Sequence, residues 1–143
     1  YQASELPAEK LGARETAQLL GVDAMLVYKT IVVRRLKGKP ILAVIPGPHQ
    51  VDLKLLAAAI GEKKLFLATE AEAEHLTGLQ AGGISPLALI NKGFHVVIAK
   101  EAEAAPSFHI SGGQRGLNLH LAVKVVADLT KARFASISRP ENA

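Results

Sequence analysis

Short apolar runs, separated by glycine and proline, predict a mixture of strands and helices along this chain. Runs rich in β-branched residues are typical of strands, and apolar residues spaced three or four apart are typical of helices. We expect strands over residues 27–33, 41–45, 65–67, 94–99, 108–110, 117–121 and 133–137. We expect helices over residues 7–20, 53–60, 69–76 and 123–129. Strands outnumber helices and come partly as hairpins, so the predicted fold class is α+β rather than a strict βαβ alternation.

Capping and turn residues mark the element boundaries. Asp52 and Thr69 are good N-cap residues for the helices that follow them. Gly38, between two apolar runs, predicts a β-hairpin. The turn is surrounded by four basic residues, Arg34, Arg35, Lys37 and Lys39. These residues could contact a phosphate or form a solvated hairpin tip, and the solvated tip is the favoured interpretation.

One cation, Lys29, lies inside the strand predicted over residues 27–33. Alternate residues of a strand face opposite sides, and both sides of this one are mostly apolar, which predicts a central strand covered on both faces. An ammonium group there is costly unless it meets an anion or reaches water. Either Lys29 serves a binding site, or it lies at the strand end and extends to solvent, and the spacing alone leaves both interpretations open.

The composition describes a globular protein with a mildly basic surface. The 143 residues are 49% hydrophobic and carry a net charge of +4, which suits one domain over residues 1–143 and permits a polyanionic partner. The chain has no cysteine, no long apolar run and no secretory signal pattern, so we expect a cytoplasmic protein without disulfides or a membrane anchor. Because the chain does not begin with Met, we expect that a segment preceding Tyr1 is missing.

Two glycine-containing loops could bring backbone N–H groups close to a ligand. One begins at Gly82-Gly83, and the other is Ser111-Gly112-Gly113, followed by Arg115. For each loop by itself, an ordinary turn between elements is the favoured interpretation. Neither loop is a Walker motif or a dinucleotide-binding fingerprint, because the closing Lys-Ser/Thr and the βαβ context are missing.

Other catalytic and metal-binding patterns are not evident. No serine lies in a G-x-S-x-G elbow, and the five histidines lack H-E-x-x-H spacing. His109 and His120 flank the second glycine loop and could lie near it, although half-buried strand positions are the favoured interpretation. Glutamates 70, 72 and 74 alternate along a predicted helix, where a spacing of two scatters the side chains, so a solvated face is favoured over a metal site. We expect no metal and no cofactor.

Taken in order, three motifs resemble those of the YbaK-like aminoacyl-tRNA deacylases, relatives of the editing domain inserted in bacterial prolyl-tRNA synthetases. The motifs are Tyr28-Lys29-Thr30, Gly82-Gly83-Ile84-Ser85-Pro86 and residues 111–117, Ser-Gly-Gly-Gln-Arg-Gly-Leu. The resemblance covers nearly the whole chain. It implies a single editing domain with a mixed, mostly antiparallel, barrel-like sheet and flanking helices.

The resemblance further implies that the protein hydrolyses the ester of a mischarged tRNA, Cys-tRNA(Pro) or one carrying another small amino acid. It implies that a water attacks with help from the substrate's own ribose hydroxyl, without a covalent nucleophile. The catalytic set that it implies is Lys29, Gly82, Gly83 and Ser111. The substrate-binding set that it implies is Tyr28, Thr30, Ile84, Ser85, Pro86, Gly112, Gly113, Arg115 and Asn118.

The chain departs from this family at Asn118, where many relatives have an acidic residue. The implied partners are aminoacyl-tRNA and, as an open possibility, a prolyl-tRNA synthetase. The alternative function is a non-catalytic module that binds a tRNA end or a nucleotide, either within a synthetase or beside one.

Overall fold

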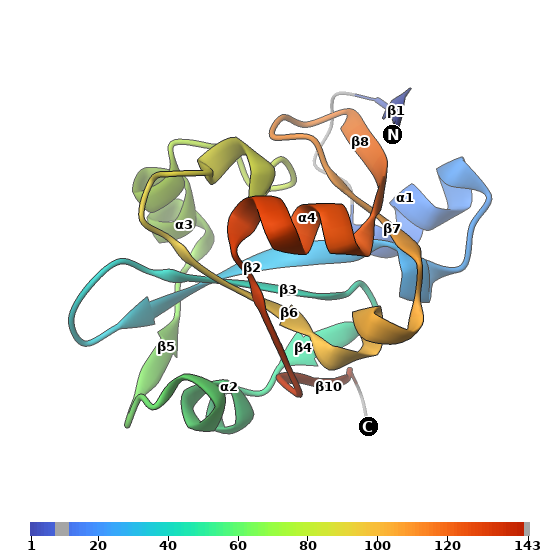
Figure 1. Cartoon of the computed structure of the whole chain (residues 1–143). Coiled ribbons are helices and arrows are strands. Elements are labelled where there is room, and N and C mark those ends of the chain that lie inside the picture. Colours follow the sequence, from blue (N-terminus) through green and yellow to red (C-terminus); the bar gives the residue numbers. More distant parts are fainter. Residues whose placement is uncertain (8–11, 142–143) are drawn as a thin grey trace.

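A five-stranded mixed sheet forms the centre of the molecule, as described by a computed structural model for residues 1–7 and 12–141 (Figure 1). Its strand order is β5-β2-β3-β6-β9. The strands are β2 (Tyr28–Arg35), β3 (Ile41–Pro46), β5 (Leu65–Leu67), β6 (His95–Ala99) and β9 (Arg133–Ala135). β2 is antiparallel to both of its neighbours, whereas β3, β6 and β9 run parallel to one another. The fold class is α+β, which confirms the prediction from the sequence.

Two smaller sheets complete the β-structure. In the first, β8 (Leu117–Ala122) lies between β1 (Gln2–Glu5) and β7 (Ser107–Ser111). The second pairs β4 (His49–Val51) with β10 (Ser138–Pro140). The sheet that was expected to be barrel-like does not form a closed barrel, because the central sheet of the described residues ends at β5 and β9.

Four α-helices surround these sheets, with α4 lying across the central sheet in the view of Figure 1. They are α1 (Ala13–Leu20), α2 (Leu53–Ile60), α3 (Glu70–Thr77) and α4 (Val123–Thr130). Three short 3₁₀ helices connect other elements: η1 (Ala24–Leu26), η2 (Leu87–Leu89) and η3 (Lys100–Ala104). The first helix begins later than predicted, because Gly12 is its N-cap, and residues 8–11 of the predicted range lie outside the described residues. Residues 2–5, before the predicted helix, form the strand β1.

The core is centred on β3, in which all six residues are buried. Helix α4 contributes the fully buried Val126, and Phe108 and Ile110 of β7 reach the same core. β2 is covered less completely than the sequence predicted, because Lys29, Thr30 and Ile31 on its two faces are only half-buried. Along its outer edge, the short β5 pairs only with residues 33–35, and Val32 accepts a bond from Ala68. Residues 29–31 of that edge have no partner strand on that side among the described residues.

The basic hairpin is bound to acidic neighbours at its base. Arg35 donates to Glu62 at 2.7 Å, and Arg34 lies 3.1 Å from Glu72. The Lys39 ammonium lies over the ring of Phe94. Three of the four basic residues thus have partners within the chain.

None of the helices in the described part of the chain has the length and apolar character needed to cross a membrane.

Candidate active site

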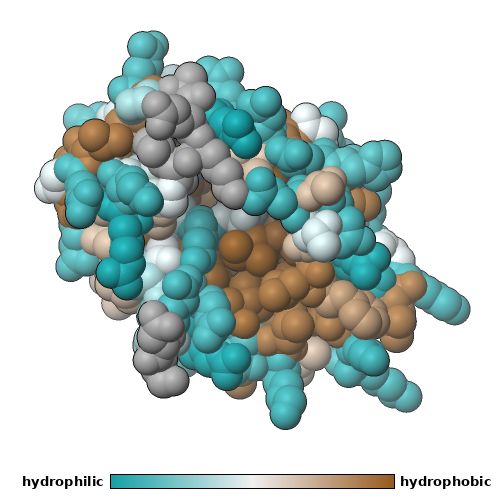
Figure 2. Space-filling model, turned by 180° about the vertical axis from the view of Figure 1, so that it is seen from behind, coloured by the Kyte–Doolittle hydropathy of each residue, from teal (hydrophilic) through white to brown (hydrophobic). Residues whose placement is uncertain are grey.

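A pocket of about 360 Å³ opens beside the uncovered edge of β2. β2 forms one wall, α1 and the start of α3 form two others, and the two glycine-containing loop regions complete it. The lining residues are Gly12, Ala13, Thr16, Val27, Tyr28, Lys29, Thr30, Ile31, Val32, Ala68, Thr69, Glu70, Ala73, Ala81, Gly82, Ile84, Ser111 and Asn118. Most of these side chains are apolar or small, and the face turned away from α4 carries a broad apolar area (Figure 2). The pocket therefore offers a mixed surface, in which small and apolar side chains lie beside polar ones such as Lys29, Glu70 and Asn118.

The uncovered edge also offers backbone hydrogen-bonding groups. Val32 accepts a bond from the N–H of Ala68 on this side of β2. Because N–H and C=O groups alternate between the two sides of an antiparallel strand, those of Thr30 face the same side. The pocket thus meets a segment of backbone as well as the side chains of β2.

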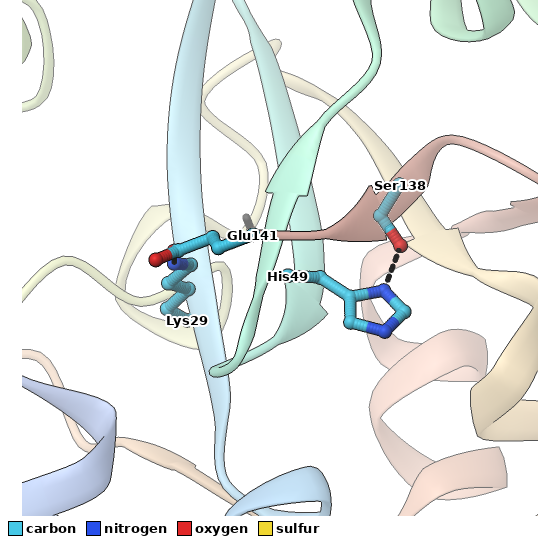
Figure 3. Close-up of polar contacts among 4 residues, drawn as sticks. All are labelled: Lys29, His49, Ser138 and Glu141. Carbon is cyan, nitrogen blue, oxygen red and sulfur yellow. Dashed lines mark hydrogen bonds and ion pairs between the residues drawn. The ribbon is translucent and has the colours of Figure 1, made fainter. Parts of the chain in front are cut away.

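Lys29 is the cation of this pocket, and it is bound to an anion. Its ammonium nitrogen lies 2.8 Å from Oε1 of Glu141, just after β10 (Figure 3). The side chain of Lys29 is 30% exposed, and that of Glu141 is 43% exposed. The hydrogen bond and charge of Lys29 hold the pKa of Glu141 below its usual range. The sequence-based expectation that this ammonium must meet an anion or water is therefore confirmed.

Tyr28 supports the pocket from the core side. Its ring packs against Phe108 with centroids 5.0 Å apart. Burial, with a contribution from the Glu101 charge, raises the pKa of Tyr28 to about 12. The phenol is consequently neutral at physiological pH and can donate a hydrogen bond, but it cannot act as a base there.

The two glycine loops are joined behind the pocket. Arg115 donates through Nε to the carbonyl oxygen of Ala81 at 2.6 Å. Gly83 packs so closely on the other loop that an added Cβ would lie 2.7 Å from the carbonyl carbon of Gln114. A side chain at residue 83 would separate the loops.

Gly82 and Ile84 of the first loop line the pocket, and Gly82 adopts a left-handed conformation, with φ +89°. The N–H of Gly83 already donates to Gln80 at 2.8 Å. Within the described residues, the N–H groups of Gly82 and Ile84 have no acceptor. Two lining residues therefore keep donors that a ligand oxygen could use.

Seven of the thirteen site residues expected from the sequence line the pocket: Tyr28, Lys29, Thr30, Gly82, Ile84, Ser111 and Asn118. The other six are not among the lining residues, and they are Gly83, Ser85, Pro86, Gly112, Gly113 and Arg115. Ser85 is fully buried, and its hydroxyl accepts from the N–H of Leu87. Ser111 uses its hydroxyl oxygen to accept a bond from Gly113 at 3.3 Å.

Asn118 carries an unused hydrogen-bond acceptor. It lies opposite Ser111 in the β7–β8 ladder and is 7% exposed. Its Oδ1 is buried and has no hydrogen-bond partner among the described residues. Such a group costs about 1–3 kcal/mol unless a donor reaches it. A hydroxyl or ammonium group of a ligand would satisfy it.

Several contributors to the site could not be identified from the sequence. Small side chains without a chemical signature line part of the pocket, and they belong to Gly12, Ala13, Thr16, Ala68 and Ala73. Glu141 lies 112 residues from Lys29 along the chain. Only the requirement that Lys29 find an anion pointed to such a residue, without indicating which carboxylate it would be.

The histidines lie outside this pocket's lining. His49 bonds Ser138 through Nδ1 at 2.9 Å in a buried contact (Figure 3). His109 and His120 stack with ring centroids 4.2 Å apart, so the favoured interpretation of half-buried strand positions holds for both. No group of three or more metal-binding side chains occurs within residues 1–7 and 12–141.

The pocket can position and polarise a ligand oxygen with one ammonium group and with backbone N–H groups. This arrangement suits a hydrolase that holds an already reactive ester and relies on water as the nucleophile. The model of the aminoacyl-tRNA editing domain family matches residues 8–129. The chain belongs to this family, and it is an aminoacyl-tRNA deacylase by class.

Individual relatives agree with this assignment. The chain is 36% identical over 133 residues to "Putative Cys-tRNA(Pro)/Cys-tRNA(Cys) deacylase EbsC" of Enterococcus faecalis, covering 93% of this chain and 80% of that protein. It is 30% identical over 132 residues to the proline–tRNA ligase of Thermodesulfovibrio yellowstonii, and this match covers 92% of the chain but only 22% of the ligase.

Solved structures share the fold. A "putative trans-editing enzyme for prolyl tRNA synthetase" superposes with a TM-score of 0.84 at 27% identity, covering 96% of this chain and 86% of the other. The hypothetical protein APE2540 superposes with a TM-score of 0.88 at 25% identity, with 96% and 91% coverage.

Proposed function

We propose that this protein is a trans-editing deacylase that hydrolyses a mischarged tRNA carrying a small amino acid, with Cys-tRNA(Pro) as the first candidate. The observation that carries this proposal is the meeting of Lys29, Gly82 and Ser111 in one pocket. The activity that the name of the Enterococcus faecalis relative states supports the choice of substrate.

The reaction is the addition of water to the ester carbonyl, followed by loss of the tRNA 3′-terminal ribose oxygen. The free ribose hydroxyl of the substrate accepts the proton of the attacking water and passes it to the leaving oxygen. The N–H groups of Gly82 and Ile84 stabilise the carbonyl oxygen as it becomes negative. Lys29 holds the terminal nucleotide and its ester in line with these donors, and Asn118 accepts a hydrogen bond from the amino or hydroxyl group of the substrate.

Pocket size limits what is recognised. About 360 Å³ accommodates an aminoacyl group and part of a ribose, so the rest of the tRNA must lie outside. Apolar walls separate amino acids that differ by one methylene only about 10- to 200-fold. Discrimination among small amino acids therefore depends on the few polar groups in the pocket and on the tRNA.

The proposal extends to the protein's setting. Residues 1–143 act as one editing domain in the cytoplasm, and aminoacyl-tRNA is the partner. A prolyl-tRNA synthetase that delivers the substrate is compatible with the ligase relatives.

The test compares the wild-type protein with Lys29→Ala on a panel of aminoacyl-tRNAs, following loss of the ester. Because Lys29 is the only cationic side chain among the described residues that line the pocket, we expect its loss to reduce turnover about 100-fold or more. Lys124→Ala is the matched control, because Lys124 is exposed on α4 and should remain fully active.

Full turnover by Lys29→Ala would remove this residue from the mechanism. Tight binding of aminoacyl-tRNA by the wild-type protein with every ester intact would select the binding-module alternative instead.

A further inference from the structure

We propose that Glu141 is a positioning residue, which holds the ammonium group of Lys29 in the orientation that the reaction requires. This inference rests on the proposed function. It concerns a residue outside the pocket lining that no motif includes.

The first support is how firmly the chain before Glu141 is held. Ile137 is fully buried, and its carbonyl oxygen accepts a bond from Asp52 at 2.8 Å. Ser138 then bonds the buried His49, and β10 pairs with β4 in register. The N–H of Glu141 itself donates to Pro48 at 3.0 Å. These contacts fix the backbone from which the carboxylate reaches β2 (Figure 3).

The second support is the state of the lysine. Within the described residues, Glu141 is the polar partner of the Lys29 ammonium, at 2.8 Å. A lysine side chain has four flexible bonds, so an unbound ammonium group would sample many positions. An ammonium group has three donors, and Glu141 uses one, which leaves two for a ligand in the pocket.

Charge explains why the contact persists. The hydrogen bond and charge of Lys29 act together on the carboxyl group, with Arg14 and His49 contributing further positive charge. Glu141 is consequently ionised throughout the neutral range. In the opposite arrangement, the Glu141 carboxylate would compete with the substrate for Lys29, and turnover would become faster when the Glu141 charge is removed. The two arrangements therefore predict opposite effects of Glu141→Gln.

The experiment measures kcat and KM for deacylation by Glu141→Gln and by Glu141→Asp. The matched control is Glu103→Gln, which removes the same charge from an exposed position and so accounts for any general gain in tRNA affinity. We expect kcat of Glu141→Gln to fall about 10-fold relative to Glu103→Gln, with KM nearly unchanged, because misplacing a positioning group costs rate. Glu141→Asp keeps the charge on a shorter side chain, so its kcat should lie between those of Glu141→Gln and the wild-type protein.

A second readout does not depend on turnover. In spectra of ¹⁵N-labelled lysine ammonium groups, the Lys29 signal, identified by its loss in Lys29→Ala, should shift or broaden in Glu141→Gln and stay unchanged in Glu103→Gln.

A Glu141→Gln variant with the kcat of the control, or with a higher one, would overturn the proposal, as would an unchanged Lys29 signal. If the wild-type protein hydrolysed no aminoacyl-tRNA, the proposed function itself would fail. An active wild type with an unaffected Glu141→Gln variant would reject only the role of Glu141.

Discussion

Asn118 illustrates how a single residue can be better suited to a ligand than to the fold. Its side-chain oxygen is buried without a donor, opposite Ser111 and beside the pocket. A protein selected for stability alone would place an apolar side chain of similar size there, because an unsatisfied buried acceptor is unfavourable. The polar group is readily explained if a substrate supplies the missing donor.

We therefore predict opposite effects of Asn118→Leu on stability and activity. The free energy of unfolding should stay the same or rise by about 1 kcal/mol, because an unsatisfied acceptor is removed while the volume is kept. The KM for aminoacyl-tRNA should rise, because the substrate loses a hydrogen bond. Urea unfolding and deacylation kinetics measure the two effects. A variant that loses stability while keeping its KM would contradict this role.

The sequence predicted that Lys29 needs an anionic partner, but it did not predict which residue provides it. An ammonium group on an apolar strand requires an anion, and this requirement follows from local chemistry. The identity of the anion depends on β10 lying beside β4, a contact made between distant parts of the chain. Residue-level reasoning could thus identify half of the ion pair.

At the scale of elements, predictions succeeded where the determining contacts are local. Helix α2 begins and ends where Asp52 and Gly61 predicted, and Asp52 accepts bonds from two N–H groups of the first turn. Thr69 forms a full capping box with Glu72 at the start of α3. The strands β1, β4 and β10 were not predicted, because their three or four residues become strands only through pairing with distant segments.

The two capped helices allow a prediction about the pocket. Thr69→Ala and Asp52→Ala should each lower the free energy of unfolding by about 1 kcal/mol through loss of an N-cap. Thr69, at the start of α3, lines the pocket, whereas α2 does not. We therefore expect only Thr69→Ala to raise the KM for aminoacyl-tRNA. Equal effects of both variants on KM would show that the start of α3 has no special role in binding.

At the scale of the whole molecule, the site is assembled from five parts of the chain. The α1 region, β2, the start of α3, the first glycine loop and the β7–β8 pair all contribute lining residues. Through the family resemblance, the order of the motifs along the sequence indicated which segments form the site. Their distances and the depth of the pocket are properties of the assembled fold, which no local pattern contains.

Stability of the whole molecule should depend on pH through its partly buried histidines. Burial, with nearby positive charge, lowers the pKa of His95 and of His109. Below the unfolded pKa of about 6.5, the unfolded chain binds protons that these folded histidines do not, so stability is lost as the pH falls.

Urea midpoints should accordingly be lower at pH 5.5 than at pH 8, and replacing both histidines with glutamine should reduce the difference. Glu72 and Glu141 contribute in the same direction only at lower pH, because their depressed carboxyl pKa values lie below the ordinary range. A midpoint that rises on acidification would contradict the assigned pKa directions.

The short β5 has a consequence for how this protein avoids unwanted association. It leaves residues 29–31 of β2 without a partner strand on that side, and such an uncovered edge is the kind of surface on which other chains can add strands and aggregate. Here that edge lies within a pocket walled by parts of two helices and two loops. We expect these walls to keep a foreign strand from pairing with the edge, and so to protect the protein against fibril-like growth.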